Sequence, residues 1–168
     1  MSVALGDVLS NIIRHRKWIE HARAEGLELL VFPELSLTGY GLKTAVTEVA
    51  MEADDERLLA LAAAAGDMQV ILGFVEETTP GKYCNAMAVL QYGEVTAVYR
   101  KMILPTYGGL EEGKWFSPGR QLVCSEIRPG WKSSSLICED MWNAGVVHCG
   151  GVIPLFLALP RQWLSSGL

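Results

Sequence analysis

Residues 70–101 read VILGFVEETTPGKYCNAMAVLQYGEVTAVYRK, three apolar runs separated by two short turn signals. Val, Ile, Phe and Tyr recur through the runs, and such β-branched and aromatic residues favour strands. The turn signals fall at Thr79–Gly81 and at Tyr92–Gly93, and short links of this kind join antiparallel strands. The stretch therefore predicts strands over 70–75, 85–90 and 95–99, joined as hairpins.

Two helical stretches precede these strands. Residues 8–24 carry apolar side chains at helical spacing with charged residues between them, which predicts an amphipathic helix that ends near Gly26. A strand over 27–32 follows at once. A second helix is predicted over 55–65, begun by acidic residues and ended by Gly66. Helices and strands in a chain of 168 residues predict an α/β fold large enough to bury a core.

The second half of the chain has less regular secondary-structure patterns. Residues 105–119 hold four glycines and two prolines, which predicts a loop, and strands are predicted over 122–127 and 133–137. From residue 143 onward the apolar residues follow neither a helical period nor a strand alternation. We therefore divide the chain into a domain over 1–142 and an atypical apolar tail over 143–168.

Composition and charge exclude several classes of protein. The net charge is −5 and the Lys and Arg residues are scattered, whereas nucleic-acid binding requires them to be clustered. The chain has no apolar run of about 18 residues, and its start, MSVALGDVLSN, does not read as a secretory signal, so we expect a cytoplasmic protein with no membrane partner. The four cysteines lack zinc spacing and are expected to be free thiols.

Three separated motifs each carry a side chain suited to the cleavage of an amide. VFPELSLTGY carries Glu34, YRKMILPTYGG carries Lys101, and SSLICEDMW carries Cys138. Each side chain follows an apolar run of strand type, and ligand crevices in α/β sheets lie at the carboxyl ends of strands. The pattern predicts a thiol nucleophile with a carboxylate base and a cation beside it.

In these motifs the chain resembles the nitrilase, or carbon-nitrogen hydrolase, superfamily. The stretches FPELSLTGY, RKMILPTYG with LEEGKWFSPG, and LICEDMW are most similar to the glutaminase domains of glutamine-dependent NAD synthetases and to related stand-alone hydrolases. The resemblance runs from about residue 6 to residue 142. It implies a nitrilase-type α-β-β-α sandwich that dimerises into four layers, here expected to be incomplete at the C-terminal side.

The resemblance also implies roles for individual residues. It makes Glu34 the general base, Lys101 the oxyanion-stabilising lysine and Cys138 the nucleophile. Glu112 corresponds to a supporting glutamate, expected to hold Lys101 or the substrate amide by hydrogen bonding.

Two aromatic residues complete the predicted site. By resemblance, Tyr107 lies beside the substrate and Trp142 is an aromatic residue at the side of the pocket. The scheme requires no metal or cofactor, and the three histidines, His15, His21 and His148, have no part in it.

The predicted reaction is hydrolysis of a small carboxamide, with glutamine favoured, through a cysteine thioester that releases ammonia. The predicted partners are this substrate, a second copy of the chain in a homo-oligomer, and a synthetase that accepts the ammonia. Two alternatives stay open. One is a nitrilase or carbamoyl hydrolase with the same triad. The other is a catalytically inactive truncated remnant or interaction module, with a tail from an altered reading frame.

Overall fold

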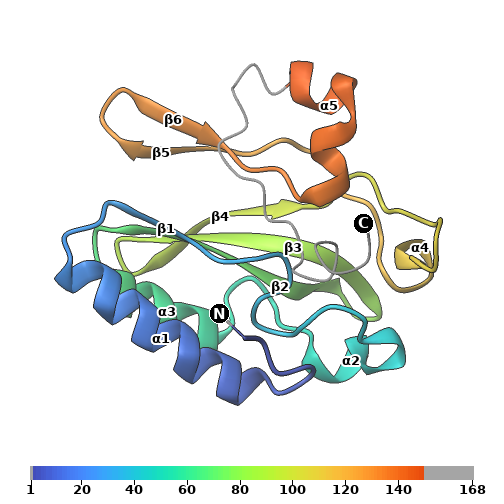
Figure 1. Cartoon of the computed structure of the whole chain (residues 1–168), viewed down its shortest axis with the longest axis horizontal. Helices are drawn as coiled ribbons and strands as arrows, with labels where there is room; N and C mark the ends of the chain where they lie inside the picture. The colour runs from blue at the N-terminus through green and yellow to red at the C-terminus, as the bar shows by residue number, and fades with distance from the viewer. Residues whose placement is uncertain (1, 150–168) are drawn as a thin grey trace, which may run out of the picture.

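The computed structural model describes residues 2–149, and Figure 1 shows how their helices and strands are arranged. In chain order the elements are α1 (Val8–Ala24), β1 (Leu29–Val31), the 3-10 helix η1 (Lys43–Ala45), α2 (Val46–Val49), α3 (Glu56–Ala65), β2 (Gln69–Thr79), β3 (Lys82–Gln91), β4 (Glu94–Arg100), α4 (Glu112–Trp115), β5 (Cys124–Arg128), β6 (Trp131–Ser134), the 3-10 helix η2 (Cys138–Trp142) and α5 (Ala144–Cys149). The α/β class predicted from the sequence is confirmed.

Strands β1 to β4 form one sheet in that spatial order. β1 pairs with β2 in parallel, whereas β2 with β3 and β3 with β4 are antiparallel hairpins, as the quoted stretch predicts. Two antiparallel steps restore the strand direction, so β4 runs parallel to β1. The carboxyl ends of these two outer strands therefore lie at the same edge of the sheet, and Glu34 and Lys101 follow them.

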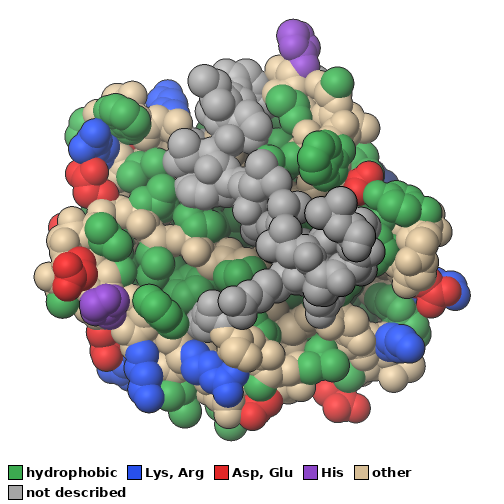
Figure 2. Space-filling model, viewed as in Figure 1, with side chains coloured by type: hydrophobic (Ala, Val, Ile, Leu, Met, Phe, Trp, Pro, Cys, Tyr) green, Lys and Arg blue, Asp and Glu red, His purple; other side chains and the backbone are tan. Residues whose placement is uncertain are grey.

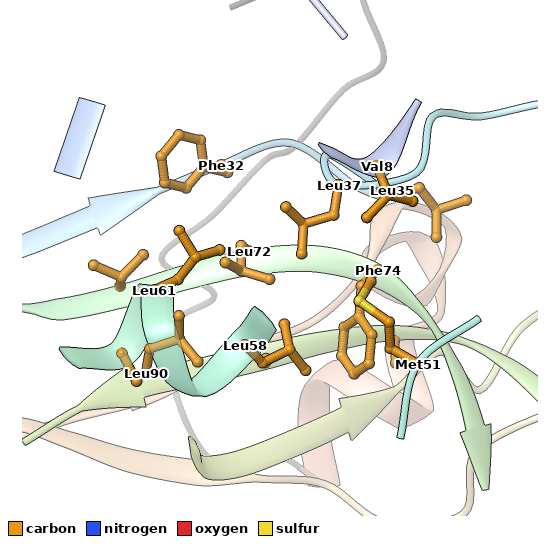
Figure 3. Packing of buried hydrophobic residues seen from close by; sticks show 14 of the residues in the cluster. Val8, Phe32, Leu35, Leu37, Met51, Leu58, Leu61, Leu72, Phe74 and Leu90 are labelled. Atoms are coloured by element: carbon orange, nitrogen blue, oxygen red, sulfur yellow. The ribbon is translucent and has the colours of Figure 1, made fainter. Parts of the chain in front are cut away.

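Helices α1 and α3 cover one face of this sheet (Figure 1), and the larger core lies between them and the strands. Asp7 begins α1 by accepting a hydrogen bond from the Ser10 amide, and Asp55 does the same for α3 through the Arg57 amide. Figure 3 shows Leu58 of α3 among apolar side chains of the strands and of the segment after β1. The fully buried members of this core include Ile19, Leu37, Leu61, Leu72 and Phe74.

A second, smaller core lies on the opposite face of the sheet. It joins Ile71, Val89 and Tyr99 of the sheet to Leu136 and Ile137, the two residues that precede Cys138. Among residues 2–149, β5 and β6 pair only with each other, as a hairpin outside the four-stranded sheet. Figure 1 shows this hairpin and α5 on the side of the sheet away from α1 and α3.

The structure differs from the sequence prediction at three places in the second half. The strand expected over 133–137 ends at Ser134, because Leu136 and Ile137 bury their side chains against the sheet instead of extending the hairpin. The loop expected over 105–119 contains the single helical turn α4, and the predicted tail begins with the short helix α5. The remainder of that tail, residues 150–168, lies outside the described residues.

Charged side chains of both signs are interspersed around the rim of the face shown in Figure 2. Among residues 2–149, no helix combines the length and the hydrophobicity that a membrane crossing requires.

Candidate active site

The loop that carries Glu34 lies directly on strand β2. A Cβ atom on Gly73 would stand 2.2 Å from the Leu35 nitrogen and 2.9 Å from the Glu34 carbonyl carbon, so only glycine allows this approach. The Leu37 amide donates to the Gly73 carbonyl oxygen at 2.9 Å. Leu35 itself adopts a left-handed φ of 49°, which turns the chain toward the site.

A series of hydrogen bonds between buried polar groups also holds the loop that carries Glu34. His15 Nδ1 lies 2.7 Å from the Asn11 carbonyl oxygen, so this nitrogen carries the proton and Nε2 accepts. Ser36 Oγ is 2.9 Å from His15 Nε2 and accepts from the Gly73 amide at 3.2 Å. Burial lowers the pKa of His15 to about 4, which keeps the ring neutral.

The Glu34 side chain lies in a buried cluster of polar groups. Its Oε1 atom accepts from Lys101 Nζ at 2.8 Å and from Asn85 Nδ2 at 2.7 Å. Its other oxygen, Oε2, is buried without a hydrogen-bond partner among the described residues. One carboxylate oxygen is thus held by two donors, while the second is available to accept a proton.

Lys101 follows β4 and joins two carboxylates. Its side chain is wholly buried, and Nζ donates to Glu34 and to Glu112, each at 2.8 Å. Tyr40 also donates to Glu112 Oε1, at 2.6 Å. An ammonium group has three N–H bonds, so these two acceptors leave one N–H for a further oxygen atom. The Lys101 amide donates to the Asn85 carbonyl oxygen at 2.9 Å, which continues the β3–β4 pairing as far as the site.

Burial and neighbouring charges decide the protonation of this cluster. Burial alone would lower the pKa of Lys101, but Glu34 and Glu112 outweigh it and hold the pKa above its ordinary value. The pKa of Glu112 is raised, first by burial and then by the charge of Glu34, although Lys101 opposes the rise. Lys101 is therefore a fixed cation at neutral pH.

The thiol of Cys138 belongs to the same electrostatic cluster. Cys138 begins η2, is half-buried, and has a left-handed φ of 46° after an extended Ile137. Burial raises the pKa of the thiol to about 11. Glu34 and Glu112 act in the same direction, and Lys101 opposes them. The structure thus brings Glu34, Lys101, Glu112 and Cys138 together, and the cysteine rests as a neutral thiol.

The two predicted aromatic contacts lie further out. Tyr107 is 54% exposed and donates through its hydroxyl to Glu139 at 2.7 Å. Trp142 is 71% exposed, at the end of η2. Tyr107 thus contacts Glu139, the neighbour of the cysteine, and both aromatic side chains stand at the surface.

Sequence reasoning missed four residues that shape this site. Asn85 and Tyr40 contact the two glutamates directly, and Asp140 is wholly buried beside the cysteine. His15, expected to have no part, supports the Glu34 loop through Ser36. Asn85 could be found from the sequence, because it is an amide side chain within the apolar run of β3. A polar group buried there needs a hydrogen-bond partner.

The fold is that of the nitrilase superfamily. The sequence model of the family described as Carbon-nitrogen hydrolase matches residues 2–149, so the match continues past residue 142, where the expected domain ends. The chain belongs to the carbon-nitrogen hydrolase family.

Relatives by sequence include glutamine-dependent NAD(+) synthetases. That of Acinetobacter baylyi is 32% identical over 143 residues, covering 85% of this chain and 26% of the relative. That of Thermotoga maritima is 33% identical over 146 residues, covering 85% of this chain and 25% of the relative. A hydrolase in the pqqF 5' region of Pseudomonas protegens is 33% identical over 141 residues, with 80% and 47% covered. The chain spans about a quarter of the synthetases and about half of the hydrolase.

Solved structures agree with these relatives. The glutamine-dependent NAD+ synthetase of Acinetobacter baumannii superposes with a TM-score of 0.77 at 30% identity, covering 89% of this chain and 28% of that one. An amidase from Nesterenkonia sp. AN1 superposes with a TM-score of 0.73 at 24% identity, with 87% and 57% covered, which supports the fold alone.

Proposed function

We propose that this protein hydrolyses the carbon–nitrogen bond of a small carboxamide through a cysteine thioester and releases ammonia. The observation that carries the proposal is the buried array in which Lys101 joins Glu34 and Glu112, with the Cys138 thiol close enough to interact electrostatically with all three. An amide carbonyl requires both a strong nucleophile and stabilisation of the negative oxygen that forms when it is attacked. The array supplies a group for each need.

The first half of the reaction forms the thioester. Glu34 Oε2 takes the proton of Cys138 as the sulfur forms a bond to the carbonyl carbon, and the π electrons of the carbonyl move to its oxygen. The remaining N–H of Lys101 donates to that oxyanion. When the carbonyl re-forms, the carbon–nitrogen bond breaks, and the proton on Glu34 passes to the nitrogen, which leaves as ammonia.

The second half restores the enzyme. Glu34 takes a proton from water, the water oxygen attacks the thioester carbon, and the carbon–sulfur bond breaks. The proton returns from Glu34 to the sulfur. The net reaction converts one amide and one water into one carboxylic acid and one ammonia.

The raised thiol pKa makes Glu34 necessary rather than merely helpful. With a pKa of about 11, Cys138 is almost entirely protonated at neutral pH, so the proton has to leave during the attack. General-base assistance contributes roughly 100- to 10,000-fold to such a step. Glu112 accepts from Lys101 Nζ and from the Tyr40 hydroxyl, so Tyr40 holds Glu112 in place and Glu112 holds the ammonium.

The relatives favour glutamine as the amide. The synthetases similar to this chain are named for their dependence on glutamine, and a glutamate-to-glutamine mutant of one amidase with this fold shows Michael addition of acrylamide at its active-site cysteine. We propose a glutamine-type carboxamide as substrate, a homo-oligomer as the active form, and a synthetase as the acceptor of the ammonia. The exposed aromatics Tyr107 and Trp142 are proposed to contact the substrate.

The test measures ammonia release from glutamine and from short aliphatic amides. Cys138→Ala is expected to abolish release. Glu34→Gln is expected to lower kcat by about 100-fold or more, because the base is lost. Cys124→Ser removes an exposed thiol elsewhere and serves as the matched control, with wild-type activity expected. Equal rates for wild type and Cys138→Ala would refute the proposal.

The same proteins separate the inactive alternative from the enzyme. Treatment with acrylamide followed by intact mass and peptide mapping is expected to give an adduct on Cys138 that forms faster than any adduct on the exposed Cys124. A panel of nitriles and carbamoyl compounds assayed in parallel identifies the nitrilase and carbamoyl hydrolase alternatives. Labelling of Cys138 at the rate of Cys124, with or without Glu34, would favour the inactive remnant.

A further inference from the structure

Asp140 is a wholly buried carboxylate two residues after Cys138. Its Oδ1 atom accepts from the amides of Met102 and Ile103, at 3.1 and 2.7 Å. Its Oδ2 atom accepts from the Tyr99 hydroxyl at 2.7 Å and from the Ile137 amide at 3.4 Å. Four donors therefore converge on one side chain.

The donors come from the two segments that have to meet for the proposed reaction. Tyr99 lies two residues before Lys101 on β4, and Met102 and Ile103 follow Lys101 directly. Ile137 is the residue before Cys138. One carboxylate thus links the chain on both sides of the lysine to the turn that carries the thiol.

The buried carboxylate of Asp140 is stabilised by its hydrogen bonds. Burial raises the pKa of Asp140, whereas the hydrogen bonds from Tyr99, Ile103, Ile137 and Met102 favour its ionised form. A carboxylate only accepts hydrogen bonds, and four donors match its two oxygens. An apolar side chain of similar volume would fill the space but leave the buried amides without acceptors, which is unfavourable.

The turn at Cys138 depends on such support. Its φ of 46° lies in the left-handed region, which residues other than glycine seldom adopt and which persists where the surroundings hold it. The Asp140 amide closes the turn further by donating to the Ile137 carbonyl oxygen at 3.1 Å. The residue that makes this turn also binds the Lys101 segment.

We propose that Asp140 is a positioning residue of the active site: it fixes the thiol of Cys138 relative to the ammonium of Lys101. This inference rests on the proposed function for its catalytic consequence. It names a residue that does not touch the substrate and acts through the alignment of two groups that do. A displacement of about 1 Å in such an alignment lowers rates by roughly 100-fold.

The main variant is Asp140→Asn, which keeps the size of the side chain. An amide offers one oxygen and one NH₂ group, so at least one backbone amide now faces a donor instead of an acceptor. We expect kcat to fall by about 100-fold, with KM changed by less than about 3-fold, because alignment in the transition state is lost rather than binding. Tyr99→Phe removes one of the four donors and is expected to lower kcat by about 10-fold.

A second readout needs no substrate. The rate at which iodoacetamide modifies Cys138 is measured from pH 7 to 11 by peptide mapping, with the exposed Cys124 of the same sample as internal reference. If the turn loosens, the thiol becomes exposed to solvent. Burial, the main cause of its raised pKa, is then lost. The pH profile of Cys138 is therefore expected to shift by about one unit or more toward lower pH in Asp140→Asn, while that of Cys124 stays unchanged.

Asp55→Asn is the matched control, because Asp55 is also a carboxylate that accepts from a backbone amide and it caps α3 away from the site. It is expected to leave kcat and the Cys138 profile unchanged. A variant Asp140→Asn that melts earlier but keeps both readouts would reduce Asp140 to a structural residue and overturn the inference. If Asp140→Asn does not fold, Tyr99→Phe decides by the same two readouts. A wild type without amidase activity refutes the proposed function, while the modification profile still tests the alignment.

Discussion

The loop that carries Glu34 and the turn that carries Cys138 reach the same site by different routes. The loop lies on strand β2 of the main sheet, where Gly73 admits its backbone and Ser36 and His15 hold it through buried hydrogen bonds. The turn follows the separate β5–β6 hairpin, and Asp140 fixes it with its side chain. Glu34 is therefore held directly on the main sheet, whereas Cys138 lies on a segment outside that sheet.

This difference determines which substitutions should disturb the Glu34 loop and which should disturb the Cys138 turn. Glu34 and Lys101 follow the outer strands of one sheet, Asn85 lies in its β3, and hydrogen bonds of 2.7 and 2.8 Å already join the three. Cys138 enters this array through a half-buried turn and one carboxylate. Changes beneath the Glu34 loop should disturb the fold as a whole, whereas changes around the hairpin should disturb the thiol first.

Substitution of Gly73 by alanine should have the largest effect on the Glu34 side. The added Cβ would meet the Leu35 nitrogen at 2.2 Å, and backbone cannot move aside as a flexible side chain can. We expect the free energy of unfolding to fall by about 3 kcal/mol or more, at the upper end of the range for overpacking. Urea unfolding followed by circular dichroism measures it.

Gly113→Ala is the matched control for Gly73→Ala. Gly113 lies in α4, and a Cβ there would meet only the methyl group of Thr106, at an ordinary contact of 3.4 Å. Alanine in a helix is expected to be neutral or slightly stabilising. Similar losses for the two variants would show that the close approach of the loop to β2 is not what holds Glu34.

His15 should make the Glu34 side sensitive to acid. Its pKa is lowered from 6.5 to about 4 by burial, so below pH 6.5 the unfolded chain takes up a proton that the folded chain does not. The free energy of unfolding should therefore fall by up to about 3 kcal/mol more between pH 6.5 and 4 than it does without this group. Urea titrations of wild type and His15→Gln across this pH range give the difference.

The control for this pH dependence is His21→Gln, because His21 is an exposed histidine on the same helix. Its curve should follow that of the wild type. Parallel curves for wild type and His15→Gln would mean that burial does not lower the pKa of His15. The predicted acid sensitivity of the Glu34 side would then be refuted.

The sequence predicts the parts of this fold that local chemistry decides. The hairpins around residues 79–81 and 92–93 and the helix over 8–24 follow from turn residues and apolar periodicity, and all three are confirmed. The strand prediction is wrong for Leu136 and Ile137, because an apolar pair can be buried either by strand pairing or by packing onto a face of the sheet. Only the rest of the molecule decides between these.

The same division applies to the candidate site. Motifs point to Glu34, Lys101, Glu112 and Cys138, and the structure brings these four together. Their partners are not local in sequence, since 51 residues separate Asn85 from Glu34 and 72 separate Tyr40 from Glu112. No spacing rule relates residues so far apart. The role of Asp140 is equally remote, because the amides it binds lie 37 and 38 residues earlier.

The smallest expected effect concerns how the hairpin is attached to the sheet. Gln91 is buried at the end of β3, accepts from Gln69 Nε2 at 3.1 Å and donates to the carbonyl oxygens of Asp67 and Ile127 at 3.0 and 3.4 Å. Gln91→Leu removes these bonds and should lower the free energy of unfolding by about 1 to 3 kcal/mol. Hydrogen exchange in peptides covering residues 124–134 should quicken more than exchange in β2.

The surface ion pair between Arg128 and Glu28, at 2.9 Å, provides the contrast at the same junction. Both side chains are about half exposed, so solvent screens the pair, and Arg128→Gln should change the free energy of unfolding by less than about 1 kcal/mol. Raising the salt concentration should shrink that small difference further, and should leave the effect of Gln91→Leu in place. If Arg128→Gln proved the more disruptive, the hairpin that delivers Cys138 would be held mainly by surface charge, and its attachment to the sheet would depend on ionic strength.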